Sequence, residues 1–185
     1  MNSISSHEVT FLRQIQLLLE RTYSPVGINL ESCLIGHQRY AELSALAGPM
    51  AQELSHEART FLRVLDGRLH IAIYYHPGVI RALERCHPLQ ILNKDNIRPL
   101  IVFLEELNHA IHASLRFLEN QLQIESENLL CDLELQAKVD TYLALKLIAT
   151  ILRKRRPLTQ RQQNWLQNCL FGQESFDYRQ SILQT

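Results

Sequence analysis

The sequence has few glycines, and none of them forms a nucleotide-binding signature. Six glycines are scattered over 185 residues, and neither G-x-G-x-x-G nor G-x-x-x-x-G-K-[ST] occurs. The G-x-S-x-G elbow, which carries the nucleophile of many serine hydrolases, is also absent. The chain therefore lacks the usual motifs of dinucleotide-binding enzymes, P-loop NTPases and α/β-hydrolases.

Cysteines and long apolar runs are scarce as well. The four cysteines form no C-x-x-C pair, which argues against a zinc ribbon or a thioredoxin-type site. No basic segment precedes the first apolar stretch, and no stretch approaches the ~18 uninterrupted apolar residues of a membrane span. We therefore expect free thiols in a cytoplasmic protein that has no membrane partner.

The chain has no excess of charge of either sign. Lys and Arg number 19, as do Asp and Glu, so the formal net charge is zero at pH 7. A general nucleic-acid binder usually carries a positive excess, which makes this class unlikely here. One local exception is the run Arg153 to Arg156, which could contact phosphates. Positive charge at the C-terminal end of a helix also stabilises that helix, which is the alternative explanation.

Two runs of strand-forming residues flank Asp66-Gly67, the pair that a two-residue type I′ hairpin favours. Pairing Leu65 with Arg68 gives the hairpin one apolar face and one mixed face. Because two strands alone are marginal in water, we expect the hairpin to pack on helices or to join a further strand. The stretch "INLESCLI" at 28–35 is the candidate for that strand, and a short strand or a turn of helix are both compatible with its loop-like surroundings. Together with the helical patterns elsewhere, this predicts an α+β fold, a mainly helical single domain over residues 1–185 with a small antiparallel sheet.

Apolar spacing predicts four longer helices. They run from about Ser6 to Tyr23 behind a Ser5/Glu8 capping box, from about Pro99 to Leu122, from Leu129 to Arg155, and from Gln160 to Leu170 behind Thr159. The third of these has a predicted buried side made of Leu133, Ala137, Ala144, Ile148, Ile151 and Leu152.

The stretch "FLEELNHAIHA" at 103–113 carries the strongest candidate for chemistry. At about 100° per residue, Glu105, His109 and His112 share a sector roughly 60° wide, opposite an apolar stripe. The segment "EELNH" is the metallopeptidase pattern H-E-x-x-H with Glu105 in place of the first histidine. The alternative interpretation is an ordinary helix face whose Glu and His side chains are solvated or make structural hydrogen bonds, and a pairing surface is a third possibility.

The order of these elements resembles a degenerate gluzincin, a type of zinc metallopeptidase, over roughly residues 58–152. The hairpin, "YYHPGVIRALE" and "ELQAKVD" also resemble a bacterial family without an assigned activity. The gluzincin resemblance implies that Glu105, His109 and Glu134 are metal ligands and that Glu106 is the general base. Glu134 precedes Lys138 by four residues, so a surface ion pair explains it equally well.

The leading prediction is a non-catalytic interaction or regulatory module on this degenerate zincin-like scaffold. It would need no cofactor, and its partner would be an unknown protein or a second copy in a homo-oligomer. The alternative is a zinc-dependent hydrolase that uses Glu105, His109 and Glu134 with Glu106. A phosphate or nucleic-acid binder that uses Arg153 to Arg156 is the second alternative.

Overall fold

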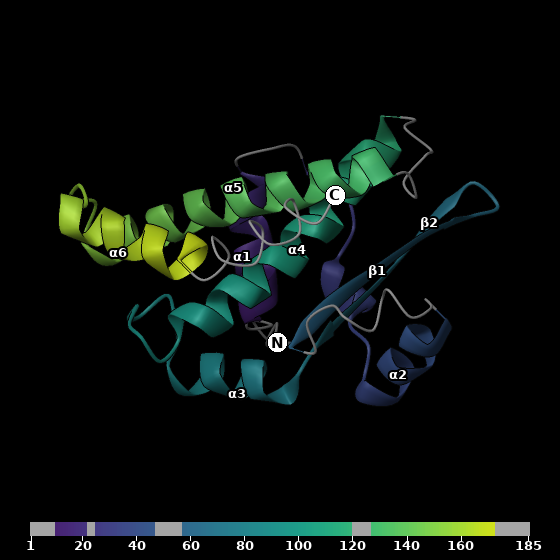
Figure 1. The fold of residues 1–185 in the computed structure, drawn as a ribbon, viewed down its shortest axis with the longest axis horizontal. Coiled ribbons are helices and arrows are strands. Elements are labelled where there is room, and N and C mark those ends of the chain that lie inside the picture. Colours follow the sequence, from purple (N-terminus) through teal and green to yellow (C-terminus); the bar gives the residue numbers. More distant parts are fainter. Residues whose placement is uncertain (1–9, 22–24, 47–56, 120–126, 173–185) are drawn as a thin grey trace, which may run out of the picture.

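A computed structural model describes residues 10–21, 25–46, 57–119 and 127–172 (Figure 1). Within these ranges the chain forms six α-helices, one 3₁₀ helix and one antiparallel pair of strands, so the predicted α+β class is confirmed. The elements are α1 (Phe11–Glu20), η1 (Leu30–Cys33), α2 (His37–Leu46), β1 (Ala58–Leu65), β2 (Arg68–Tyr75), α3 (Pro77–Arg85), α4 (Ile97–Leu118), α5 (Glu127–Leu152) and α6 (Gln160–Phe171).

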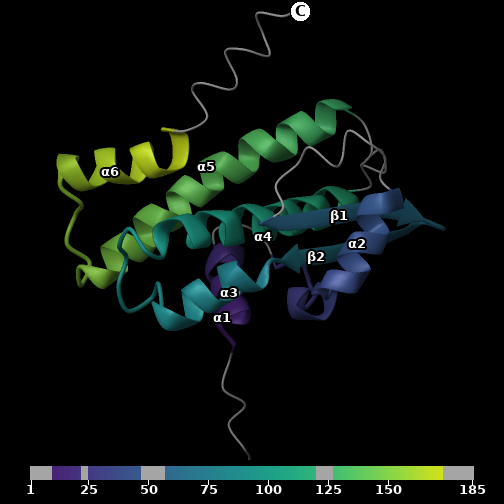
Figure 2. The same ribbon diagram turned by 60° about the horizontal axis from the view of Figure 1, so that its bottom comes forward.

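Helix α4 is the centre of the molecule. Leu100, Leu104 and Leu107 on this helix are fully buried. Helices α5 and α6 lie on one side of α4, and α1 and α3 lie on the opposite side (Figure 2). Because neighbours cover α4 on several sides, its side chains reach the interior whether they are apolar or polar.

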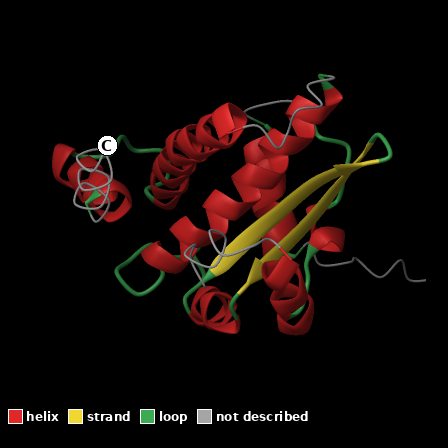
Figure 3. Ribbon diagram, turned by 45° about the vertical axis from the view of Figure 1, so that its right-hand side comes forward, coloured by secondary structure: helices red, strands yellow, loops and turns green. Residues whose placement is uncertain are grey.

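The β1–β2 hairpin has the predicted register and packs along α4 (Figure 3). Leu65 pairs with Arg68, and the turn between them has positive φ at Asp66 and Gly67, 50° and 66°. The Tyr75 hydroxyl of β2 donates a hydrogen bond of 2.9 Å to the carbonyl oxygen of Phe103, which belongs to α4. The hairpin therefore gains from α4 the support that two strands lack by themselves.

Of the two alternatives for residues 28–35, the turn of helix is present, and the third strand is absent except for one bridge. Residues Leu30–Cys33 form the 3₁₀ helix η1, and Leu34 then makes a single parallel bridge to Ile73. The Ile35 amide donates to the Ile73 carbonyl over 2.9 Å. Asn29 caps η1 by accepting from the Glu31 amide, which favours a helical turn at the place where the strand was expected.

Helix boundaries differ from the predictions at two places. Thr10 is the N-cap of α1, while the predicted Ser5/Glu8 box lies outside the described residues. Helix α5 ends at Leu152 because Lys154 and Arg155 have positive φ, 54° and 65°, which reverses the chain before α6. The capping box of α6 at Thr159 is present. In the part of the chain that the structure describes, no helix is both long and apolar enough to cross a membrane.

Gly67 offers a direct test of the hairpin turn. Replacing Gly67 with Val should destabilise the protein by about 1–2 kcal/mol, since a β-branched residue resists positive φ. Asn tolerates this backbone conformation, so Gly67→Asn is the matched control and should cost much less. Urea denaturation of the three proteins measures the difference. Equal stabilities for the Val and Asn variants would contradict the turn assignment.

Candidate functional site

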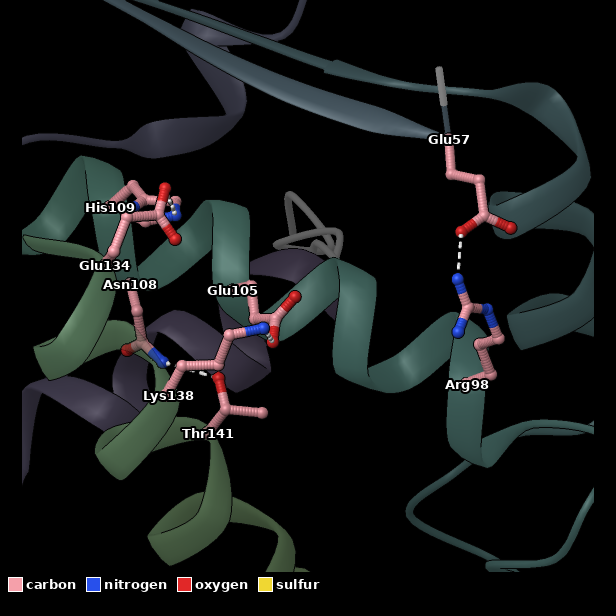
Figure 4. Close-up of polar contacts among 8 residues, drawn as sticks. All are labelled: Glu57, Arg98, Glu105, Asn108, His109, Glu134, Lys138 and Thr141. Atoms are coloured by element: carbon pink, nitrogen blue, oxygen red, sulfur yellow. Dashed lines mark hydrogen bonds and ion pairs between the residues drawn. The ribbon is translucent and has the colours of Figure 1, made fainter. Parts of the chain in front are cut away.

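The candidate site lies where α4 packs against α5. Glu105, Asn108 and His109 point from α4 toward α5, and Glu134, Lys138 and Thr141 of α5 approach them (Figure 4). Of the alternative interpretation, solvation is wrong for this side of α4, because Asn108 is 0% exposed and His112 only 2%, whereas structural hydrogen bonding is present at Glu105 and His112. Helix α5 covers this side of α4, which spacing along α4 alone could not reveal.

Two acid–base contacts connect the predicted site residues to α5. The Lys138 Nζ atom lies 2.9 Å from Glu105 Oε1, with both side chains about one-fifth exposed. One turn further along α4, His109 Nε2 lies 3.5 Å from Glu134 Oε1. The structure thus brings His109 and Glu134 together as predicted, and it places the ammonium group of Lys138 on the remaining proposed ligand, Glu105.

A more deeply buried pair follows on the same interface. His112 Nε2 and Asp140 Oδ2 are 2.5 Å apart, and neither side chain is more than 6% exposed. Next to them, Asn108 Nδ2 donates to Thr141 Oγ1 over 3.2 Å. These polar contacts between the two helices were not predicted. Their signal in the sequence was the position of Asp140 and Thr141 between Ala137 and Ala144, at the spacing of the buried side of α5.

Glu106, the predicted general base, has an altered acidity. Burial raises the pKa of its carboxyl group from 4.5 to about 7, and the nearby Glu134 and Glu105 carboxylates add to this effect. The Thr60 hydroxyl opposes the shift; it also donates to the carbonyl oxygen of Glu106 over 3.0 Å. A carboxyl group with a pKa near 7 can take up or release a proton at neutral pH.

The pKa of the His109 imidazole is lowered, whereas the pKa of the Glu106 carboxyl group is raised. Burial lowers the pKa of His109 from 6.5 to about 4, and positive charge on His112 or Lys138 adds to the lowering. His109 is therefore neutral at pH 7. Its contact with Glu134 is then a weak polar contact between a neutral ring and a carboxylate, because 3.5 Å is long for a hydrogen bond.

The proposed ligands do not form a metal site as they are placed. Among the described residues, no three His, Cys, Asp or Glu side chains are positioned to hold a metal ion. One imidazole with two carboxylates is also a poor donor set for zinc, which prefers more nitrogen or sulfur. The zinc ion that the gluzincin resemblance implies therefore does not fit this arrangement.

The basic run at the end of α5 divides into two parts. Arg153 is half-buried, and its Nη1 atom donates to Gln162 Oε1 of α6 over 2.5 Å. Lys154, Arg155 and Arg156 are exposed in the turn between the two helices. Arg153 thus joins α5 to α6, whereas phosphate or nucleic-acid binding by the run stays a prediction.

Comparisons of the chain with protein-family models, with curated proteins and with solved structures found no match. The function therefore has to be argued from the chain itself.

The two shifted groups make opposite contributions to the pH dependence of stability. Folded protein keeps the Glu106 proton up to about pH 7, whereas the unfolded chain loses it near pH 4.5. The stability that Glu106 contributes to the folded state is thus fully present below pH 4.5 and is lost as the pH rises to 7. Folded protein keeps His109 neutral down to about pH 4, whereas the unfolded chain binds a proton below 6.5. The His109 contribution is complete above pH 6.5 and is lost as the pH falls to 4.

Two variants should separate these contributions. Relative to the unmodified chain, Glu106→Gln should gain stability as the pH rises from 4.5 to 7, because it lacks a contribution that declines over this range. His109→Gln should lose relative stability over the same range. The difference in unfolding free energy between each variant and the unmodified chain can change by up to about 1.4 kcal/mol per pH unit. Denaturant unfolding at several pH values measures both, and slopes of the same sign would contradict the assignment.

Proposed function

We propose that this chain is a non-catalytic interaction module that binds a protein partner through one face of α5. The observation that carries this proposal is a stripe of exposed apolar side chains on α5, here called the outer face. Its members recur every fourth residue and are 40–68% exposed: Leu135, Val139, Leu143, Leu147 and Ile151. From Leu135 to the end of α5 at Leu152, these five are the exposed residues of the helix.

The outer face is unusual because α5 is also apolar on its buried side. Leu133, Ala137, Leu145 and Ile148 of α5 are buried toward the rest of the molecule. A helix that is apolar on both sides is normally covered on both. No element of the described chain lies beyond α5 on the side away from α4 (Figure 2), and the five side chains of the outer face are exposed. A contiguous apolar stripe of this kind is typical of a protein interaction site.

The contacts at the α4–α5 interface support a non-catalytic role. Lys138 neutralises Glu105, the residue that stands where a zincin has its first histidine. The structure has the hairpin, α4 and α5 in the order on which the resemblance to a gluzincin rests, and the hairpin packs on α4. We therefore propose a degenerate zincin-like scaffold in which the helix pair serves to present the outer face.

A photoreactive residue at the outer face tests this proposal. With p-benzoylphenylalanine in place of Leu143, irradiation of cells of the natural host should give a discrete cross-linked protein species. The same residue in place of Leu65, which is 45% exposed against 47% for Leu143, is the matched control and should give none. Absence of any adduct from position 143, or equal adducts from both positions, would contradict the proposal.

A metal-dependent hydrolase is the second candidate, and the acidity of Glu106 is the observation that favours it. A pKa of about 7 suits a general acid–base catalyst at neutral pH. His109 is also neutral at that pH, as a metal ligand must be.

Zinc binding separates the two candidates. A site that binds zinc only in the folded state would stabilise the protein by roughly 2.7 kcal/mol at a hundredfold excess over the dissociation constant. We expect no such stabilisation, because Lys138 already binds Glu105. Thermal unfolding with and without zinc measures it. A zinc-dependent rise in Tm that disappears in both His109→Ala and Glu134→Ala would establish the hydrolase candidate instead.

A further inference from the structure

We infer that the partner of the outer face is a second copy of this chain, bound so that the two α5 helices run antiparallel about a two-fold axis at Leu143. This inference rests on the proposed function and names its partner. Two features of α5 carry it: the symmetry of the apolar stripe about its middle residue, and the opposite charges at its two ends.

The stripe is suited to pairing with itself. In a two-fold interface the same surface of both copies meets, so residue i contacts j and j contacts i. The stripe turns by about 40° around α5 at each step of four residues, so Val139, Leu143 and Leu147 lie within about 80° of the helix surface, and Leu135 and Ile151 lie at its flanks. With Leu143 on the axis, Val139 of one copy lies level with Leu147 of the other. These three residues therefore form the apolar centre of the contact, over about 12 Å of helix at 1.5 Å per residue.

Charge favours the antiparallel direction. Near the first turns of α5, Asp132 is exposed and lies about 20° from Leu143 around the helix, whereas Glu134 lies on the side toward α4. Just past the other end, Lys154, Arg155 and Arg156 are exposed. Antiparallel pairing about Leu143 places Asp132 of one copy level with Lys154 of the other. A parallel pair would bring like charges together at both ends, which is unfavourable.

The apolar surface also continues from α5 onto α6. The rings of Tyr142 and Phe171 have centroids 6.1 Å apart, and Phe171 is 44% exposed. Lys146 lies over the Tyr142 ring at 5.4 Å, so an aromatic and cationic border follows the stripe on this side. Such a border around an apolar centre is the usual anatomy of a protein interface.

Sedimentation equilibrium of the full-length chain tests the oligomeric state. We expect a monomer–dimer equilibrium, with a dissociation constant that rises at least about tenfold in Leu143→Glu, because the axis would place the two glutamates together. Leu65→Glu has a similarly exposed position on the hairpin and should leave the equilibrium unchanged. A chain that stays monomeric at about 100 μM, or equal effects of the two variants, would overturn the inference.

Cysteine cross-linking tests the direction and register, and it does not depend on a charged substitution. Under mild oxidation Leu143→Cys should form a disulfide-linked dimer. Val139→Cys should not, since its copies would lie about 12 Å apart along the helices, beyond the ~7 Å limit between the Cα atoms of a disulfide. A mixture of Val139→Cys and Leu147→Cys should cross-link. The native Cys131 gives the background, because its two copies would be about 36 Å apart. Cross-linking of Val139→Cys alone would overturn the antiparallel register.

The photoreactive residue at position 143 separates failure of this inference from failure of the proposed function. An adduct between two copies supports both. An adduct with a different protein, in a chain that is monomeric by sedimentation, supports the interaction module and overturns the second copy as partner. An adduct within one chain, to residues 173–185, assigns the outer face to that segment and overturns both.

Discussion

The structure depends on the way α5 satisfies the polar side of α4. Asn108 and His112 are as deeply buried as the leucines on the opposite side of their helix, and a buried polar group without a partner is costly. From α5, Thr141 accepts a hydrogen bond from the Asn108 amide nitrogen and Asp140 pairs with the His112 ring. The pairing fixes how the two helices meet, because the hydrogen bonds are directional whereas apolar contacts between helices tolerate sliding.

This constraint explains the other features of the molecule. With one side of α5 committed to α4, its remaining apolar residues have to face outward, which creates the outer face. The same packing lowers the hydration of Glu106 and His109 and shifts both pKa values toward the neutral forms. Shifted acidity is often a sign of catalysis, but here burial between packed elements is the largest cause, and structural burial produces such shifts equally well.

Local rules predicted the hairpin and several helix ends well. Asp66-Gly67 fixed the turn, and the alternation of the flanking strands gave every pair of the register. Thr159 gave the start of α6. The site was harder, because the pattern "EELNH" specifies which side chains share a face of α4 and says nothing about what lies opposite. Lys138 is 33 residues from Glu105, and no local pattern connects them.

The sequence by itself determined the features whose stabilising contacts lie within a few residues: the type I′ turn, the Thr159 capping box of α6 and the apolar periodicity of α4. Only the tertiary structure decided which polar residues are buried and which apolar residues are exposed. Ile151 illustrates the reason, since its spacing placed it with the buried side of α5 and it is 46% exposed. A helix that is apolar all round can bury either side, and its neighbours in space make the choice.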